Sequence, residues 1–391
     1  MNKRKVLFIT PSLCQGGLEH SLITMLKLLD KGRYDITLFT YREDMSLAPL
    51  IPPEVKIIND TSKPHYFRKP KAILYNMIKT FASKLHLSNL SNKYSDKLKD
   101  YIHNQKVKYP SKTHFANEKF DVVVSNAIGI GTEMALYINA KKRTVFFRSS
   151  VDLHHDMLEK IFPKYDMIIG VSQGVKDMLQ NAYPMVADKI TVVENYVDST
   201  HILEKADSQN DVIQKPSDDT YIISTCGRFS EEKGFDMAVE AAKLLKEKGC
   251  SFIWYFLGDG SQRNLLEERI KQYSLESNIV ITGYLDNPFP YMKNSDIYVQ
   301  PSYHESYGRT IKEAQILGIP IVSTDTVGGK TVLKDGEYGI LTSIDANGLA
   351  DGIVAMMDKI QNGTISSLLY TQEDNIHERE TFVNKIEDML S

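Results

Sequence analysis

The chain has 391 residues, of which 42% are hydrophobic and 25% are charged, and its formal net charge is -3. This length is too great for one ordinary core and fits two domains of roughly 150 to 200 residues each. No apolar run approaches the roughly 20 residues that cross a bilayer, and the three widely spaced cysteines indicate neither a disulfide framework nor a zinc cluster. These properties argue against a membrane-spanning or disulfide-stabilised protein, and we expect a cytoplasmic one.

The first part of the chain alternates strand and helix patterns, beginning with a buried strand at residues 5–10. The apolar part of this strand is shorter than the h-region of a signal peptide, which needs about 7 to 15 residues. A glycine-rich turn and a helix follow, which is how a doubly wound α/β domain begins. The predicted strands are 5–10, 35–41, 55–58, 120–125, 143–147, 167–171 and 190–193, and the predicted helices are 18–29, 131–140 and 173–181.

Residues at the ends of these strands are candidates for a ligand pocket, because ligands of doubly wound domains bind there. Gly16 and Gly17 let a ligand approach the backbone closely, although the same pair could simply form a tight turn. Arg148, Ser149 and Asp152 follow the strand at 143–147 and are expected to face the same crevice.

A basic segment at about 62–116 interrupts this domain. It contains 12 Lys or Arg against two acids, so its charge is +10. Apolar residues recur at helical spacing in 69–87, which predicts an amphipathic helix. Two interpretations remain open: the segment lies on an anionic membrane surface, or it is a helical hairpin packed on its own domain. Nucleic acid is disfavoured as a partner because no binding motif accompanies the charge.

A polar, irregular stretch at 201–218 is typical of a linker and follows a first domain of residues 1–200. A second domain at 219–370 restarts the alternation, which indicates a mainly parallel sheet with right-handed crossovers. The final helix, within 371–391, could pack back on the first domain. The predicted strands of the second domain are 221–226, 251–257, 279–282, 297–300 and 319–323, and its main predicted helices are 235–248, 262–273 and 309–317.

The stretch 301–323, PSYHESYGRTIKEAQILGIPIVS, carries the most informative pattern. A helix is expected to begin just after a turn at Tyr307 and Gly308, and its free N–H groups suit phosphate oxygens. Glu305 and Glu313 flank the start of this helix and can accept hydrogen bonds from hydroxyl groups. A phosphate site between two acids suits a sugar nucleotide, whose diphosphate lies between two polyols, better than a bare phosphate.

These motifs together resemble the family 4 retaining glycosyltransferases. The resemblance covers nearly the whole chain and implies the GT-B architecture, in which two Rossmann-like doubly wound domains enclose a cleft. The N-terminal domain would bind the acceptor and the C-terminal domain the nucleotide sugar. The motifs are GGLE at 16–19, VSQGV at 171–175, ENYVD at 194–198, CGRFSEEKG at 226–234, LGDGS at 257–261, ITGYLDN at 281–287 and HESYGRTIKEAQILGIPIVSTDTVGG at 304–329.

The resemblance also implies roles for individual residues. Arg228 and Lys233 should clamp the donor diphosphate, where negative charge develops on the leaving group. Glu313 should bind the ribose hydroxyls, and Glu305 should face the transferred sugar. The catalytic set would therefore be Glu305, Arg228 and Lys233. The donor-binding set would be Gly16, Gly17, Arg228, Lys233, Tyr284, Glu305, Tyr307, Gly308, Arg309, Thr310 and Glu313, with Tyr284 near the base.

The reaction implied by the resemblance moves a hexosyl group from a nucleotide-diphosphate sugar, UDP rather than GDP, to a hydroxyl of a glycan or lipid-linked acceptor in cell-surface polysaccharide synthesis. We expect neither a cofactor nor a metal, because no Asp-x-Asp motif occurs and arginine and lysine can supply the counter-charge. The protein would act in the cytoplasm, or at the inner face of the membrane if the basic segment binds there.

Two positions depart from the family pattern. Arg148 stands where many relatives carry a histidine, and GGKTVLKDG at 328–336 lacks the glutamate that usually follows the glycines. Arginine cannot act as a base near neutral pH. A non-catalytic homologue that binds glycan or stabilises a partner is therefore an alternative. A GT-B epimerase or phosphorylase is disfavoured by the 304–329 pattern.

Overall fold

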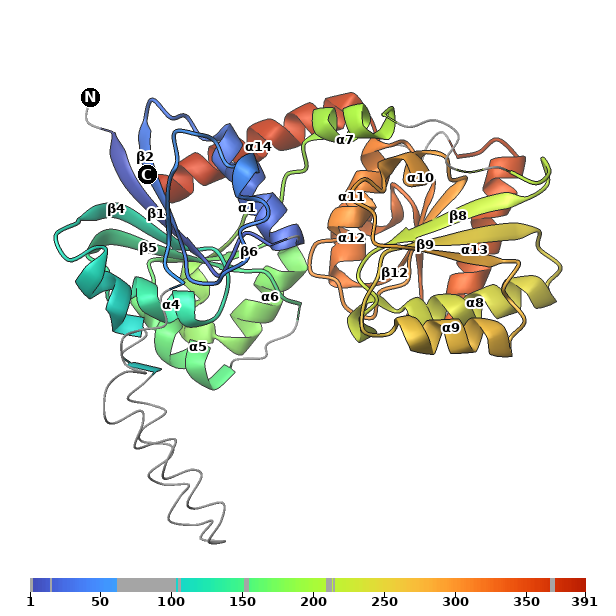
Figure 1. Ribbon diagram of the computed structural model, residues 1–391, viewed down its shortest axis with the longest axis horizontal. Helices are drawn as coiled ribbons and strands as arrows, with labels where there is room; N and C mark the ends of the chain where they lie inside the picture. Colours follow the sequence, from blue (N-terminus) through green and yellow to red (C-terminus); the bar gives the residue numbers. More distant parts are fainter. Residues whose placement is uncertain are drawn as a thin grey trace, which may run out of the picture.

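The computed structural model describes residues 3–14, 16–61, 103–104, 107–150, 155–208, 213, 215–365 and 370–391. They form two α/β lobes that lie side by side (Figure 1). Each lobe is built around one sheet, and every paired strand in both sheets is parallel to its neighbour. The alternation of strand and helix in the sequence is therefore realised as two doubly wound sheets.

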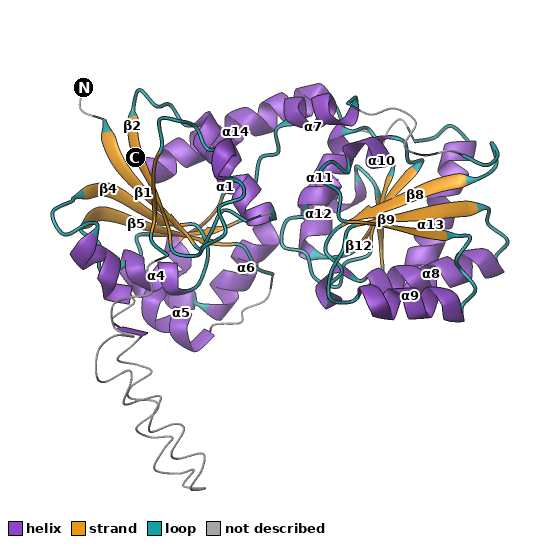
Figure 2. Cartoon of the chain, viewed as in Figure 1, coloured by secondary structure: helices purple, strands orange, loops and turns teal. Residues whose placement is uncertain are grey.

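The first lobe contains a seven-stranded sheet in the order β3-β2-β1-β4-β5-β6-β7. Helices cover both faces of this sheet (Figure 2), which is why β1 carries a continuous apolar run rather than an alternating pattern. The strands are β1 (Arg4–Thr10), β2 (Tyr34–Thr40), β3 (Lys56–Asn59), β4 (Phe120–Ser125), β5 (Ala140–Phe147), β6 (Met167–Gly170) and β7 (Ile190–Val192).

The helices of this lobe follow the strands in sequence, with the last one contributed by the end of the chain. Residues 107–113 are also helical, whereas 62–102 and 105–106 of the basic segment lie outside the described residues. The helices are α1 (Gly17–Leu28), α4 (Ile130–Ala135), α5 (His155–Ile161), α6 (Gln173–Ala182) and α14 (Gln372–Leu390), with 3₁₀ turns η1 (Ala48–Leu50), η3 (Phe162–Lys164) and η4 (Pro184–Lys189). The helix α7 (Ser199–Ala206) follows this sheet in sequence but packs against the second lobe.

The second lobe contains a six-stranded sheet in the order β10-β9-β8-β11-β12-β13. Its strands are β8 (Tyr221–Cys226), β9 (Phe252–Leu257), β10 (Ile279–Gly283), β11 (Ile297–Gln300), β12 (Ile321–Thr324) and β13 (Ile340–Thr342). Its helices are α8 (Phe235–Glu247), α9 (Arg263–Gln272), α10 (Phe289–Lys293), α11 (Arg309–Ile316), α12 (Val327–Leu333) and α13 (Ala346–Gln361), with 3₁₀ turns η5 (Glu231–Lys233) and η6 (Lys334–Gly336).

The strand order reverses once in each sheet, between β1 and β4 in the first and between β8 and β11 in the second. Such a reversal opens a crevice at the carboxyl ends of the two strands, because the helices that follow them pass to opposite faces. The loops after β1, β8 and β11 are therefore the places where this fold presents residues to a ligand.

The stretch that the sequence analysis expected to be irregular begins as a helix. Asp198 caps α7 by accepting a hydrogen bond from the backbone N–H of Thr200 at 3.1 Å, which satisfies one of the free donors of the first turn. Ile202 and Ala206 are buried on its inner face. Polar composition alone thus concealed a capped helix, and the expectation of an irregular segment at 201–218 was wrong for residues 201–206.

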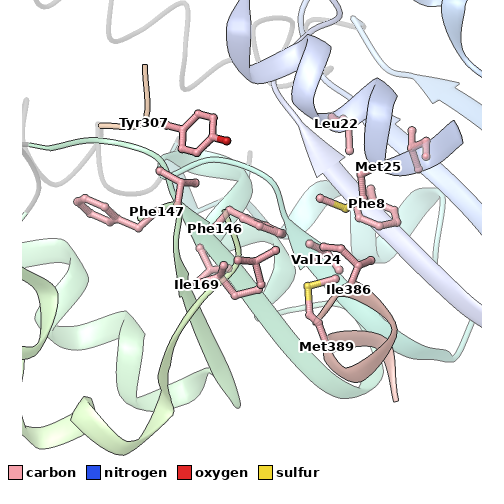
Figure 3. Packing of buried hydrophobic residues seen from close by; sticks show 14 of the residues in the cluster. Phe8, Leu22, Met25, Val124, Phe146, Phe147, Ile169, Tyr307, Ile386 and Met389 are labelled. Atoms are coloured by element: carbon pink, nitrogen blue, oxygen red, sulfur yellow. The ribbon is translucent and has the colours of Figure 1, made fainter. Parts of the chain in front are cut away.

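Helix α14 returns the end of the chain to the first lobe (Figure 1). Thr371 and Asp374 form a capping box at its start, and the Asn375 Oδ1 accepts a hydrogen bond from the Tyr196 hydroxyl at 3.0 Å. Further along, Ile386 and Met389 are buried in the apolar cluster of the first sheet (Figure 3). Within the described ranges, no helix combines the length and apolar character needed to cross a membrane.

Candidate functional site

A cleft of about 540 Å³ lies between the lobes at the two points where strand order reverses. Most of its lining follows the carboxyl ends of strands in the second lobe, and the remainder comes from the first turn of α1. The lining residues are Gly16, Gly17, His20, Cys226, Gly227, Arg228, Glu232, Lys233, Leu257, Gly258, Asp259, Tyr284, Leu285, Pro288, Glu305, Arg309, Thr310 and Glu313. Nine residues predicted as donor-binding are thus brought together here: Gly16, Gly17, Arg228, Lys233, Tyr284, Glu305, Arg309, Thr310 and Glu313.

The start of α11 forms one wall of this cleft. Gly308 is its N-cap residue and has φ +86°, a left-handed conformation that side chains other than glycine rarely adopt. The first turn closes through the backbone N–H of Lys312, which donates to the Gly308 carbonyl at 3.0 Å. The N–H groups before Lys312 have no partner inside the helix, and they give this end of α11 its capacity to bind an anion.

Thr310, in the same turn, has its side chain committed elsewhere. Its hydroxyl donates to Gln300 Oε1 at 2.8 Å, and the same oxygen accepts the hydroxyl of buried Tyr298 at 2.7 Å. The amide nitrogen of Gln300 donates to Ser302 Oγ at 2.8 Å. A buried polar network at the end of β11 therefore fixes the helix start, and Thr310 offers the cleft its backbone rather than its hydroxyl.

Two cations face the cleft from the loop after β8. Arg228 is exposed, and among the described residues its guanidinium has neither a hydrogen-bond nor a salt-bridge partner. Lys233, at the end of η5, donates from Nζ to Glu305 Oε2 at 2.6 Å, with 26% of its side chain exposed. The free guanidinium is available to an incoming anion, whereas the ammonium is already paired.

Glu305 is held from two directions besides its pair with Lys233. Its carbonyl accepts the backbone N–H of Gly328 at 2.8 Å, and the loop before it is tied to η5 through the N–H of Tyr303, which donates to the Glu232 carbonyl at 3.0 Å. Only 12% of the Glu305 side chain is exposed. These contacts fix the carboxylate near the phosphate-binding end of α11.

Glu313 lies one turn further along α11 and is buried. Its Oε1 accepts a hydrogen bond from Arg309 Nε at 2.9 Å, and the two side chains are 9% and 22% exposed. Burial raises the pKa of the Glu313 carboxyl, and the attraction and hydrogen bond of Arg309 oppose that rise. A buried carboxylate on the cleft wall is a strong acceptor for hydroxyl groups of a ligand.

The first lobe contributes the turn at Gly16 and Gly17 and the side chain of His20. Burial, together with the nearby cations Arg309 and Lys27 and the ring of His201, lowers the pKa of His20 to about 4. This histidine is therefore neutral near pH 7. From the sequence it could have been either a surface or a pocket residue, and the structure places it in the cleft.

Tyr307, predicted to contact the donor, has a different environment. Its side chain is 6% exposed and belongs to the apolar cluster of the first lobe, near Phe147 (Figure 3). It is not among the residues that line the cleft. Its ring packs at the boundary between the lobes, near the end of β5 (Figure 3). Gly308 also lies outside the cleft lining, although its backbone conformation sets the start of α11, which forms one wall of the cleft.

Arg148 does not line the cleft either. Its Nε and Nη2 donate to the carbonyl and Oδ1 of Asn126 at 3.1 and 2.9 Å, and its Nη1 donates to Asn195 Oδ1 at 2.6 Å. The guanidinium lies 4.5 Å from the centroid of the Phe146 ring. Burial lowers the pKa of Arg148 to about 10. The side chain thus joins the ends of β4, β5 and β7 through neutral acceptors.

The backbone of this strand end still touches the second lobe. Ser306 Oγ donates to the Arg148 carbonyl at 2.9 Å, so the residue after Glu305 is linked directly to the end of β5. Ser149 follows at the end of the strand, and it is not among the residues that line the cleft. Asp152, the third residue predicted for the acceptor side, lies outside the described residues.

Several lining residues were not predicted from the sequence: Cys226, Glu232, Asp259, Leu285 and Pro288. All five stand in or beside the motifs after β8, β9 and β10, so their position at strand ends was the available signal. Burial raises the pKa of the Cys226 thiol to about 12, which keeps it protonated. Tyr284, which was predicted, is 59% exposed at the mouth of the cleft and offers an aromatic face there.

Among the described residues, no three His, Cys, Asp or Glu side chains come together as a metal-binding group. The charged groups that line the cleft are instead four carboxylates and three basic side chains: Glu232, Asp259, Glu305, Glu313, Arg228, Lys233 and Arg309. This set can bind an anion and polyhydroxyl groups on either side of it.

Comparison with known proteins shows which proteins this arrangement resembles. Residues 207–361, which contain the second sheet and most of the cleft lining, match the family model of the glycosyl transferases group 1. The second lobe is therefore similar to the domain that this family model describes, and the chain has the two-domain GT-B fold.

Relatives with assigned activities match over part of the chain. The 2-deoxystreptamine N-acetyl-D-glucosaminyltransferase of Niallia circulans is 28% identical over 209 residues, or 50% of this chain and 52% of that protein. The N-acetylgalactosamine-N,N'-diacetylbacillosaminyl-diphospho-undecaprenol 4-alpha-N-acetylgalactosaminyltransferase of Campylobacter jejuni is 26% identical over 205 residues, or 52% and 53%. The chain thus spans about half the length of these relatives.

Solved structures match over the whole chain, at low sequence identity. Anabaena HepE in complex with UDP has a TM-score of 0.68 and 17% identity, with 99% of both chains covered. A glycosyltransferase from Rickettsia africae has a TM-score of 0.67 and 20% identity, with 100% of this chain and 96% of that chain covered. These neighbours establish the fold of both lobes together.

Proposed function

We propose that this protein is a retaining, family 4 hexosyltransferase that moves a sugar from a UDP-sugar to a hydroxyl of a glycan or lipid-linked acceptor in cell-surface polysaccharide synthesis. One observation carries the proposal. Arg228, Lys233 and the start of α11 converge on one cleft with the carboxylates of Glu305 and Glu313. An anion site flanked by hydroxyl acceptors matches the chemistry of a sugar nucleotide.

The diphosphate would bind between the start of α11 and the two cations. Arg228 can form charge-assisted hydrogen bonds at once, because no group in the described part of the chain occupies its guanidinium. Lys233 would share its charge between Glu305 and the phosphate. Negative charge grows on the departing nucleotide diphosphate in the transition state, so cations placed here stabilise the transition state more than the bound substrate.

The two carboxylates would have separate roles. Glu313, buried on the wall formed by α11, would accept hydrogen bonds from the ribose hydroxyls. Glu305, 2.6 Å from Lys233, would face the transferred sugar. Fixed acceptors on both sides of the diphosphate orient the reacting carbon, and orientation is a large part of the acceleration available to a transferase.

Retention of configuration would follow from attack on the face that the leaving group occupies, with the departing phosphate oxygen accepting the proton of the acceptor hydroxyl. This mechanism asks the protein for positioning and charge stabilisation rather than for a nucleophile. Arg228 and Lys233 would supply the positive charge that a divalent ion supplies in other transferases, so the reaction would need no metal and no cofactor.

The acceptor would approach from the first lobe, near the ends of β5 and β7. We assign Ser149, Asp152 and the backbone of Arg148 to that side, because the Arg148 guanidinium is committed to Asn126 and Asn195. The Campylobacter relative is named for a lipid-diphosphate acceptor, which supports a lipid-linked acceptor here. A cytoplasmic protein that touches the inner face of the membrane through the basic segment 62–116 would meet such an acceptor directly.

The test is release of nucleoside diphosphate from a panel of UDP- and GDP-sugars, with and without free and lipid-linked glycan acceptors. We expect acceptor-stimulated release with one UDP-hexose, unaffected by EDTA, and a product of unchanged anomeric configuration. Binding of a glycan acceptor without release from any donor would instead identify a non-catalytic homologue. Dependence on an added divalent ion would refute the proposed role of the two cations.

A further inference from the structure

Arg309 occupies a position at which three features of the cleft meet. It is the first residue of α11, directly after the left-handed Gly308. Its Nε donates to Glu313 Oε1 at 2.9 Å, an i,i+4 pair within one helix. Its aliphatic stem lies near the opposite lobe, since a Cβ built on Gly17 would stand 3.7 Å from Arg309 Cδ.

The environment of the Arg309 guanidinium also contains a feature that destabilises the folded protein. Arg309 Nη1 is buried and has no hydrogen-bond partner among the residues that the structure describes. A buried donor without a partner destabilises a protein, because its lost hydrogen bonds to water are not replaced. Buried ion pairs are also often no better for stability than apolar residues of similar size. Stability alone therefore does not account for this arginine, and its contact with Glu313 is the reason the structure offers.

The surroundings of Glu313 show what the contact provides. From the neighbouring strands, Cys226 on β8 and Tyr298 on β11 face the carboxyl, and burial raises the pKa of both groups so that they are uncharged. His20 of α1 faces Arg309, and its pKa of about 4 leaves it neutral. Among the described residues, Arg309 is the only side chain that forms a salt bridge with Glu313.

Burial and Arg309 act on Glu313 in opposite directions. Burial raises the pKa of the carboxyl, while the charge and hydrogen bond of Arg309 lower it. Without the guanidinium, Glu313 would stay protonated to a higher pH and could rotate away from the cleft, because nothing else in the described residues bonds its carboxylate. A protonated carboxyl is a weaker acceptor for ribose hydroxyls.

We propose that Arg309 is a positioning residue of the donor site, whose guanidinium keeps the buried Glu313 carboxylate charged and directed into the cleft, where the ribose of the nucleotide binds. The inference rests on the proposed function, because it assigns Arg309 to the site that we propose for the sugar nucleotide. Arg309 was predicted above to bind the donor, and the inference adds that it acts through Glu313.

The test is calorimetric titration of UDP into the wild-type protein, Arg309→Met, Arg309→Lys and Glu313→Gln between pH 5.5 and 8.5. Arg309→Met should bind UDP at least about 10-fold more weakly at pH 7, the range of a lost charge-assisted hydrogen bond. Its affinity should recover as the pH rises, because Glu313 then ionises without help. Arg309→Lys should retain most of the affinity, and Glu313→Gln should be weak and free of this pH dependence.

Lys243→Met is the matched control, since it removes an exposed i,i+4 partner of Glu247 on α8, away from the cleft. It should bind UDP as the wild type does. Equal affinity and an equal pH profile for Arg309→Met and the wild type would overturn the inference. So would a loss in Arg309→Met that is the same at every pH, which would indicate packing alone. If the wild-type protein bound no nucleoside diphosphate, the proposed function itself would fail.

Discussion

Among changes in the cleft, removal of the Arg228 guanidinium should best separate an effect on ligand binding from an effect on the stability of the fold. The side chain is exposed, and within the described residues it makes neither a hydrogen bond nor a salt bridge. Arg228→Ala should therefore change the free energy of unfolding by less than about 0.5 kcal/mol, as for other surface substitutions. Its effect should fall on the ligand.

The size of that effect follows from the bonds the guanidinium is free to make. A hydrogen bond to a charged group contributes about 1.5 to 3 kcal/mol, which corresponds to roughly 10- to 150-fold in affinity or turnover efficiency. UDP binding by calorimetry measures this directly. The loss should be smaller for uridine, which lacks the diphosphate.

A matched control is Lys248→Met, which removes an exposed cation that pairs with Asp351 far from the cleft. This variant should bind UDP with unchanged affinity. If Arg228→Ala bound UDP within twofold of the wild type, or lost uridine and UDP equally, the assignment of Arg228 to the phosphates would be wrong.

Three further predictions concern stability and the membrane. Glu378→Gln should lower the free energy of unfolding by about 2 to 3 kcal/mol, because the ammonium of Lys312, which is 3% exposed, then loses its partner at 2.6 Å. The double variant Glu378→Gln, Lys312→Met should recover most of that stability, and no recovery would contradict the explanation. The pKa of His20 is lowered from its ordinary 6.5 to about 4, so the unfolded chain takes up a proton at a higher pH than the folded protein does. The free energy of unfolding, measured with denaturant, should therefore fall by about 2 kcal/mol between pH 7 and pH 5, and this fall should be absent in His20→Gln. Identical pH dependence in the two proteins would refute the prediction. If the basic segment 62–116 binds membranes, co-sedimentation should require anionic vesicles and weaken with salt, and equal binding to neutral vesicles would reject this interpretation.

Much of the fold was predictable because its periodic signals are local. Continuous apolar runs such as that of β1 predict buried parallel strands, and a glycine before a helical pattern predicts the start of α11. The cleft was predictable for the same reason, since its residues follow strand ends and a doubly wound topology brings those ends together. The sequence also contained a local signal for α7, its capping residue Asp198, but the polar composition of the segment led to the prediction of an irregular stretch.

The remaining features depend on contacts between distant segments. The pairing of Lys233 with Glu305 joins residues that are 72 positions apart, and no local pattern distinguishes it from two ligand-facing charges. Arg148 was predicted to face the crevice, yet its guanidinium is satisfied by amide oxygens of Asn126 and Asn195. Tyr307 follows a loop that any sequence argument would assign to the ligand, but its burial is decided by the opposite lobe.

Backbone amide hydrogen exchange with and without UDP tests the central claim most directly, because it reports where the nucleotide binds without an acceptor or a mutation. We predict that UDP slows exchange at residues 308–311, at the start of α11, and at 226–233 and 16–17. Slowed exchange confined to other parts of the chain, or no change at saturating UDP, would contradict the assignment of this cleft to the sugar nucleotide.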